Sequence, residues 1–410
     1  MPSNRGVEPL ETLNEQRLLE QALSRGAQLN DGRLVLYAGA NLPSIDAQRA
    51  YSPALSAYPA MGPSFSKEQP DTDLVSGLEV ALRQRLCELF QAQWAEPRLP
   101  SCTFANLAVF YAFSRPGDLL LAPAAAHGGH LSQRLGGTPS LAGLKVENLA
   151  FDTRRCCLDA LRAADQVRSL RPKLVMLGRS VMIKPDDIGP VVAAAHEMGA
   201  KTIFDASHVS GLIAGGTFPN PLSLGVDILT SSTYKTIAGR PHSLIVGRLP
   251  ADEQHLTTVI DGALLANADA GKLPALLTTL REVQAHGKDY AERICANSRA
   301  LADALRHLTV AVISPTAEEI FTHQILIPMT NDMPPAAAMA TLEQYGILVG
   351  TCADPTTPGG YALRVGTQFI TAQQPGLKII AVAQRLAHAL KPTASGRMMA
   401  VDRPIPLLDR

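Results

Sequence analysis

The residues of this chain that could do chemistry include a lysine and an aspartate that each follow an apolar stretch. Lys235 lies in the polar run 230–236, directly after the apolar residues 226–229, and Asp205 ends the apolar stretch 201–205. An amine forms a Schiff base with a pyridoxal cofactor, and a carboxylate keeps the pyridine nitrogen protonated so that the ring accepts electrons. The pair therefore predicts a pyridoxal 5'-phosphate site.

The elements that must position this pair alternate between strand-like and helix-like segments. Alternation of this kind is typical of an α/β fold with a mostly parallel sheet covered on both faces. Ligands of such sheets bind at the carboxyl ends of the strands, where Lys235 and Asp205 both fall. The expected strands are 118–122, 145–151, 173–177, 201–205, 226–230 and 243–247, and the expected helices include 77–94 and 191–198.

After about Gly271 the pattern changes. A long helical stretch, 273–305, is followed by expected strands near Val310, Ile325 and Leu363 and by a final amphipathic helix, 377–390. This pattern predicts a second, smaller α+β domain. We expect an N-terminal arm over residues 1–45, a large cofactor-binding domain over 46–272, a small domain over 273–392 and a tail over 393–410.

Composition excludes several classes of function. The 410 residues carry 37 basic and 37 acidic side chains, so no net field favours nucleic acid or an anionic membrane as a partner. No apolar stretch approaches the roughly 20 residues that span a bilayer, and the first ten residues lack the apolar core of a signal peptide. The six cysteines show no CxxC spacing, which argues against a zinc site or a disulfide framework. We expect a cytoplasmic enzyme with no metal.

Four segments stand out in order along the chain. They are Ala-His-Gly-Gly-His-Leu at 126–131, Asp-Ala-Ser-His-Val-Ser-Gly-Leu at 205–212, Phe-Pro-Asn-Pro-Leu at 218–222 and Arg-Val-Gly-Thr at 364–367. With these segments the chain resembles the serine hydroxymethyltransferase family of fold-type I pyridoxal phosphate enzymes. The resemblance implies a large mostly parallel-sheet domain, a smaller α+β C-terminal domain, a homodimer and an amino acid substrate.

The same resemblance implies roles for single residues around the cofactor ring. Lys235 would be the Schiff-base lysine, and Asp205 would hold the pyridinium nitrogen. His208 would contact the phenolic oxygen of the ring. His127 would stack on the ring close to a substrate hydroxyl, and Ser180 would lie near a cofactor oxygen.

The substrate and the phosphate have their own expected residues. Arg364 would grip the substrate carboxylate through two parallel hydrogen bonds, a geometry that a planar guanidinium provides. Asn41 and His130 are further expected substrate-binding residues. Ser101, Cys102 and Thr103 precede the expected helix 105–113, whose free N–H groups favour a phosphate at its amino terminus.

Departures from the family pattern cluster on the residues that serve folate. The family's Tyr-Ala-Glu-Gly-Tyr-Pro segment is replaced by residues 54–59, so that Ser56 stands at the glutamate position. The Tyr-Tyr-Gly-Gly-x-Glu segment is replaced by 63–68. The glycine- and proline-rich loop that the family donates across a dimer to the phosphate has no counterpart in 260–270. Folate chemistry is therefore not expected.

We interpret the chain as a folate-independent aldolase or transaldolase. It would cleave or form the Cα–Cβ bond of a β-hydroxy-α-amino acid through a glycine quinonoid, with His127 or a water that it holds assisting proton transfer, and an aldehyde would be the possible acceptor. One alternative is a folate-dependent hydroxymethyltransferase for serine or an α-substituted serine, whose missing acid would be Glu68 or a water. Another is a decarboxylase or aminotransferase on the same fold. A binding protein without activity is least expected.

Overall fold

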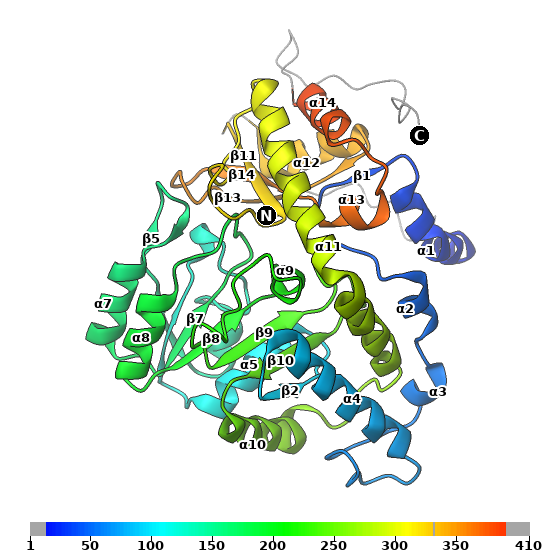
Figure 1. Cartoon of the computed structure of the whole chain (residues 1–410), viewed down its shortest axis with the longest axis vertical. Coiled ribbons are helices and arrows are strands. Elements are labelled where there is room, and N and C mark those ends of the chain that lie inside the picture. Colours follow the sequence, from blue (N-terminus) through cyan, green and yellow to red (C-terminus); the bar gives the residue numbers. More distant parts are fainter. Residues whose placement is uncertain (1–13, 331–332, 391–410) are drawn as a thin grey trace.

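A seven-stranded sheet forms the centre of the larger part of the molecule (Figure 1). The structure, a computed structural model, describes residues 14–330 and 333–390. Only β10 runs antiparallel to its neighbours; the other adjacent pairs are parallel. In spatial order the strands are β2 (Trp94–Glu96), β10 (Ser243–Gly247), β9 (Ile228–Ser232), β8 (Lys201–Asp205), β7 (Leu174–Leu177), β3 (Leu119–Ala122) and β4 (Lys145–Asn148).

Helices cover both faces of this sheet because its strands are apolar on both sides. On β7, Leu174 and Met176 join one hydrophobic cluster, whereas Val175 and Leu177 join another. This is the two-residue alternation of a strand buried on both faces. The first cluster is closed by α5 (Cys102–Phe113) and α10 (Pro250–Val259), and the second by α4 (Asp73–Phe90), α7 (Ala160–Leu170), α8 (Gly189–Glu197) and the first half of α11 (Lys272–His307).

The smaller part, at the top of Figure 1, is built on an antiparallel sheet. Its strands are β11 (Gln324–Met329), β14 (Tyr361–Gly366) and β13 (Gly350–Ala353), in the order β11-β14-β13. Its core also takes in α12 (Pro335–Gln344), α14 (Ile379–Ala389) and the second half of α11. The 36-residue α11 therefore contributes to the cores of both parts. Leu280 is buried in the larger part and Leu301 in the smaller part.

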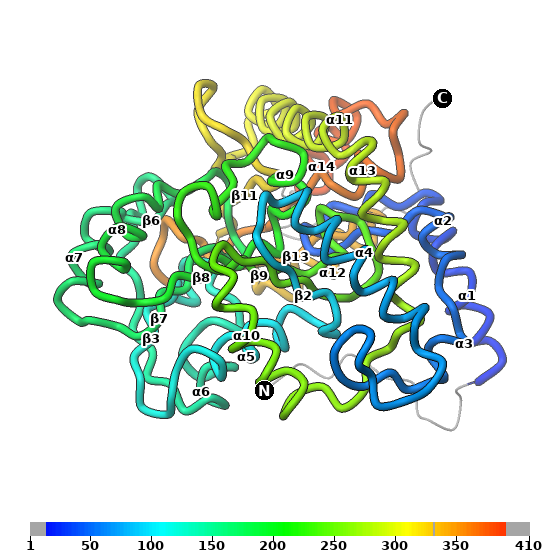
Figure 2. Tube along the Cα trace, turned by 60° about the horizontal axis from the view of Figure 1, so that its bottom comes forward, coloured from blue at the N-terminus to red at the C-terminus, as the bar shows by residue number. Residues whose placement is uncertain are grey.

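The N-terminal segment is attached to this smaller part. After α1 (Glu15–Asn30), strand β1 (Leu34–Val35) pairs in parallel with β12 (Ile347–Leu348). Leu34 and Leu36 are buried in the core of the smaller part. The chain then runs down the side of the molecule through α2 (Ile45–Arg49) and α3 (Pro53–Ser56), as the blue segment of Figure 2 shows. The first described residues thus complete the C-terminal core.

Some expected elements differ from those observed. The expected helix 77–94 spans 73–90, because Gln91 adopts a left-handed conformation (φ 54°) that ends it, and Trp94 begins β2. No strand forms at Val310; Ile313 instead makes an isolated bridge with Leu326. The predicted domain boundaries remain a prediction, and the beginning of the arm and the predicted tail lie outside the described residues.

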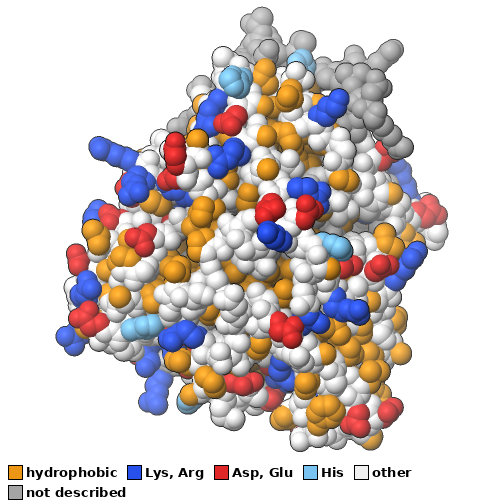
Figure 3. Space-filling view, viewed as in Figure 1, with side chains coloured by type: hydrophobic (Ala, Val, Ile, Leu, Met, Phe, Trp, Pro, Cys, Tyr) orange, Lys and Arg blue, Asp and Glu red, His pale blue; other side chains and the backbone are white. Residues whose placement is uncertain are grey.

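The surface carries mixed charge. On the face seen in Figure 3, lysine and arginine side chains are interspersed with aspartate and glutamate, and no continuous basic surface forms. Within residues 14–330 and 333–390, no helix has both the length and the apolarity needed to cross a membrane.

Candidate active site

The carboxyl ends of β8 and β9 bring the predicted lysine and aspartate to one cavity. Asp205 is the last residue of β8 and pairs in register with Thr230 of β9, and Lys235 follows in the loop after β9. The cavity, about 540 Å³ in volume, is lined from both parts of the molecule and includes Lys235, His208, His130, Ser180 and Arg364. A narrower pocket beside it reaches Ser101, Cys102, Thr103 and Asp205.

Lys235 is buried without a conventional partner. Among the described residues no hydrogen bond or ion pair reaches its ammonium, which lies 5.5 Å from the centre of the Tyr234 ring. Burial lowers the pKa of Lys235, and Arg364 acts in the same direction, whereas Asp205 and Cys102 oppose the shift. The neutral amine, which is the nucleophilic form, is therefore favoured.

The loop that carries Lys235 is fixed from two sides. Thr236 accepts a hydrogen bond from the Gly211 N–H (3.0 Å), and a Cβ at Gly211 would lie 2.2 Å from the Thr236 carbonyl oxygen. Asn41 donates to the Lys235 carbonyl (3.0 Å) and to the Tyr290 hydroxyl (2.8 Å). Asn41 does not line the cavity but holds the backbone of Lys235, and its expected substrate contact stays a prediction.

Both oxygens of the Asp205 carboxylate are held. Oδ1 accepts from the Ser207 N–H (3.0 Å) and lies 3.7 Å from the Cys102 sulfur, and Oδ2 accepts from the Asn106 side-chain amide (3.0 Å). Asn106 is fully buried and also accepts from Thr230 (2.7 Å). The sequence analysis missed Asn106, although its position one turn after Cys102 places both side chains on one face of α5.

The amino terminus of α5 forms the far end of the narrow pocket. The helix begins at Cys102, three residues earlier than expected, with Ser101 as its N-cap accepting from the Phe104 N–H (3.4 Å). The N–H groups of the first turn have no partner within the helix, so this end favours an anion. Burial raises the pKa of Cys102, and its thiol faces Asp205.

The two histidines of the 126–131 segment occupy different places. His130 lines both pockets, whereas His127 lines neither and stacks on Phe151 with ring centres 4.2 Å apart. Phe151 covers one face of the His127 ring, and the expected stacking of His127 on a cofactor stays a prediction. His130 Nδ1 accepts from the Ser132 N–H (3.2 Å) and lies 2.8 Å from the Ser132 hydroxyl, which leaves Nε2 to carry the proton of the neutral ring.

His208 lies at the back of the cavity in a buried polar cluster. Its Nδ1 lies 3.0 Å from the Gln324 amide and 3.4 Å from His323 Nε2. Burial lowers the pKa of His208 far below its usual value, and the charges of Lys235 and Arg364 add to this effect. Gln324 also donates to the Ser180 carbonyl (3.1 Å). Gln324 was not predicted as a site residue. Its signal in the sequence is a polar amide at the first position of the otherwise apolar strand β11.

Arg364 reaches the cavity from β14 and crosses to the larger part of the molecule. Its guanidinium donates to the Ser180 carbonyl (3.0 Å), so the backbone of Ser180 helps to orient it. Its Nε is buried without a partner, and among the described residues no carboxylate pairs with it. The guanidinium keeps donors for a ligand carboxylate.

Ser56, at the position of the expected glutamate, is occupied by neighbours in its own chain. Its hydroxyl donates to Asp269 (2.6 Å) and accepts from Tyr51 (3.0 Å). Gly271 packs so closely here that a Cβ would lie 2.4 Å from the Ser52 carbonyl oxygen. The 260–270 stretch therefore ends against α3, and Ser56 does not line the cavity around Lys235 of the same chain.

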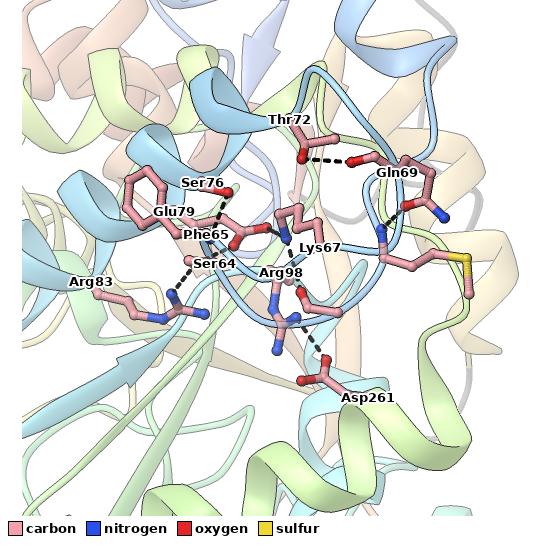
Figure 4. Close-up of polar contacts among 12 residues, drawn as sticks. Ser64, Phe65, Lys67, Gln69, Thr72, Ser76, Glu79, Arg83, Arg98 and Asp261 are labelled. Carbon is pink, nitrogen blue, oxygen red and sulfur yellow. Dashed lines mark hydrogen bonds and ion pairs between the residues drawn. The ribbon is translucent and has the colours of Figure 1, made fainter.

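The segment that replaces the second folate motif is held by a buried ion pair (Figure 4). Lys67 contacts Glu79 of α4 (2.9 Å) and the Gly62 carbonyl (2.9 Å), and the side chains of Lys67 and Glu79 are almost completely buried. The Phe65 N–H donates to Ser76 (2.9 Å). Glu68 is exposed and lines neither pocket of its own chain, so within one chain no acid is delivered from this segment.

Comparisons with known proteins agree with this geometry. A family model described as serine hydroxymethyltransferase matches residues 33–383. Serine hydroxymethyltransferase of Thermococcus onnurineus (strain NA1) is 32% identical, with 85% of this chain and 84% of that protein covered. Alpha-methylserine aldolase of Variovorax paradoxus is 31% identical, with 78% of this chain and 72% of that protein covered.

A solved structure shows the same fold. L-threonine transaldolase from Pseudomonas fluorescens superposes with a TM-score of 0.82, at 24% identity, over 91% of this chain and 86% of that one. This likeness and the observed sheet confirm the predicted fold class, a fold-type I architecture with a large mostly parallel sheet and a smaller α+β part.

Proposed function

This chain belongs to the serine hydroxymethyltransferase family, and we propose that it is a pyridoxal phosphate enzyme that breaks or forms the Cα–Cβ bond of a β-hydroxy-α-amino acid without folate. The relatives named as alpha-methylserine aldolases support an α-substituted serine as a substrate. The observation that carries the proposal is a buried, unpartnered Lys235 that faces Arg364 across one cavity, with Ser56 in place of an acid.

The residues present fit pyridoxal phosphate. Lys235 offers a neutral amine, and the preformed Asp205 carboxylate offers a partner for a protonated ring nitrogen. Ser101, Thr103 and the first turn of α5 offer donors for the phosphate. When bound, the cofactor supplies an electron sink for the α-carbon.

The remaining steps belong to the side chains. Arg364 binds the substrate carboxylate and so fixes the α-carbon. His130, in the tautomer with a proton on Nε2, donates to the β-oxygen and stabilises the charge that develops there. The Lys235 amine, whose pKa burial lowers, accepts the β-hydroxyl proton and returns a proton to the α-carbon. In this proposal His130 thus takes the role in proton transfer that was expected for His127.

A homodimer and a cytoplasmic location are part of the proposal. The face formed by Ser56, Asp269 and the 61–69 segment lies away from the cavity of its own chain, and a second copy would bring it to another site. An active monomer in analytical ultracentrifugation would contradict the dimer.

The deciding experiment measures aldehyde release from L-threonine and α-methylserine with and without tetrahydrofolate. Cleavage should proceed without folate and gain little from it, because folate chemistry requires an acid–base group close to the transferred carbon. Lys235→Ala is the inactive control. A large folate-dependent rate on serine would establish a hydroxymethyltransferase, and release of carbon dioxide or a keto acid would establish a decarboxylase or aminotransferase.

A further inference from the structure

The cavity around Lys235 contains a second arginine that the proposed reaction does not use. Arg134 lines the cavity together with Arg364 and Lys235, and no aspartate or glutamate is among the described residues that line it. Burial lowers the pKa of His130, and the positive charges of Lys235, Arg364 and Arg134 lower it further against the effect of Asp205. The cavity therefore holds more positive charge than one substrate carboxylate neutralises.

Arg134 has no partner within the part of the chain that the structure describes. Its Nε is buried and makes no hydrogen bond, and its guanidinium makes no ion pair. The two arginines that are buried more deeply differ from it, since Arg179 is paired with Asp186 and Arg98 with Glu96. A partly buried guanidinium without an ion-pair partner keeps donors for a ligand of opposite charge.

The loop that presents Arg134 is rigidly built. Its neighbour Gln133 is fully buried, accepts from the His130 N–H (2.9 Å) and donates to the Gly178 carbonyl (3.3 Å). Gly137 closes the loop by donating to the Arg134 carbonyl (3.1 Å), and a Cβ there would lie 1.8 Å from the Leu131 carbonyl oxygen. The same contacts therefore position His130 and Arg134 on one cavity.

We propose that Arg134 binds a second carboxylate, carried by the side chain of the amino acid substrate. A planar guanidinium with free donors matches a carboxylate through two parallel hydrogen bonds. The cofactor phosphate is the competing anion, but Arg134 does not line the narrow pocket at the amino terminus of α5. The inference rests on the proposed function and makes amino acids with an acidic side chain its preferred substrates.

The test is calorimetric binding to the cofactor-loaded protein of two pairs of amino acids that match in size and differ in charge. The pairs are L-glutamate with L-glutamine and L-aspartate with L-asparagine, so that two side-chain lengths are sampled. In at least one pair the acidic amino acid should bind about tenfold more tightly than its amide. This ratio of affinities corresponds to roughly 1.4 kcal/mol. Arg134→Gln should bring that ratio close to one, and Arg134→Lys should keep part of it.

Arg162→Gln is the matched control, since it removes the same charge from a side chain that is 77% exposed on α7. Its ratio should equal that of the parent. Ratios near one for both pairs in the parent protein, or a ratio that survives Arg134→Gln, would overturn the inference. A loss of cofactor affinity in Arg134→Gln with an unchanged ratio would assign Arg134 to the phosphate and also overturn it.

Failure of this inference is distinguishable from failure of the proposed function. If L-threonine is cleaved while neither pair is discriminated, the second carboxylate site is refuted and the aldolase activity stands. If the ratio depends on Arg134 while no β-hydroxy-α-amino acid releases an aldehyde, the binding site stands and the reaction is refuted.

Discussion

The side-chain amide of Asn106 lies 3.0 Å from Oδ2 of Asp205 and holds that carboxylate in place from the first turns of α5. Because the Ser207 N–H binds the other oxygen, both carboxylate oxygens are oriented by the protein itself. A carboxylate fixed in this way loses little side-chain entropy when it takes a ligand. Asn106 is therefore a positioning residue for the cofactor ring.

Asn106→Ala should weaken the binding of pyridoxal phosphate by about 1.5–3 kcal/mol, the range for a hydrogen bond to a buried charge. Fluorescence titration of the cofactor-free protein measures this affinity. Asn297→Ala is the matched control, because it removes an amide that bonds to Thr371 (2.9 Å) away from the cavity. Equal cofactor affinity in Asn106→Ala and the parent would remove Asn106 from the site.

Lys235 should carry the cofactor covalently. Borohydride reduction followed by mass spectrometry should find the pyridoxyl group on Lys235, and Lys235→Ala should abolish turnover. Because only the neutral amine reacts, the rate at which cofactor attaches to the cofactor-free protein should rise with pH and level off below the pKa of a free lysine. A pyridoxyl group on any other lysine would refute the assignment.

Arg364→Ala should leave cofactor binding intact and weaken amino acid binding by about 2–5 kcal/mol, because a buried carboxylate loses its charged partner. Spectral titration with L-threonine measures the change. Arg385→Ala is a suitable control, since Arg385 also donates to backbone carbonyls but lies outside the cavity. Unchanged affinity in Arg364→Ala would place the carboxylate elsewhere.

Substitutions of His130 and His127 should affect different properties of the protein. His130→Ala should lower the rate of aldehyde release by about 10²–10³-fold, the range for losing a donor to a developing oxyanion. His127→Ala should act on stability, with a loss of about 0.5–1.5 kcal/mol as the stack on Phe151 disappears. Measurements of kcat and of the free energy of unfolding on both variants test this difference. A large loss of kcat in His127→Ala, with little loss in His130→Ala, would support the role expected for His127.

Acid should destabilise the protein through its buried neutral histidines. Burial lowers the pKa of His242 to about 4. The unfolded chain binds the proton first, near pH 6.5, so stability present above that pH is lost as the pH falls toward 4. His242→Gln keeps a donor for the Pro97 carbonyl and should reduce the slope of stability against pH by up to about 1.4 kcal/mol per unit. Urea unfolding of His242→Gln and of the parent at several pH values measures this slope. Equal slopes in the two proteins would contradict the prediction.

Sequence reasoning was most successful where one periodicity dominates. The strands 201–205 and 243–247 have the predicted bounds because their buried residues alternate between two apolar faces. Lys235, His208 and Arg364 line one cavity, and Asp205 lines the narrower pocket beside it, because strand ends and motif order specify where such side chains emerge. The two-residue strands β1 and β12 were not predicted, because a pattern of period two needs a longer run than either provides.

Other features depend on contacts between distant segments. The sequence gives His127 and His130 the same local signal, and only the packing of Phe151 shows which imidazole is covered. Asn41 was expected to contact the substrate, yet its amide is directed to the backbone of a loop 194 positions away. Tertiary hydrogen bonds of this kind leave no mark in local composition or spacing.

The pairing of β1 with β12 sets an order for synthesis on the ribosome. Leu34 and Leu36 emerge early, but their partner strand at 347–348 is made some three hundred residues later. The central sheet, whose strands all lie before residue 248, is complete long before that. The smaller core is therefore closed last, and deletion of residues 14–36 should leave the central sheet assembled while the C-terminal part exposes apolar surface to chaperones and proteases.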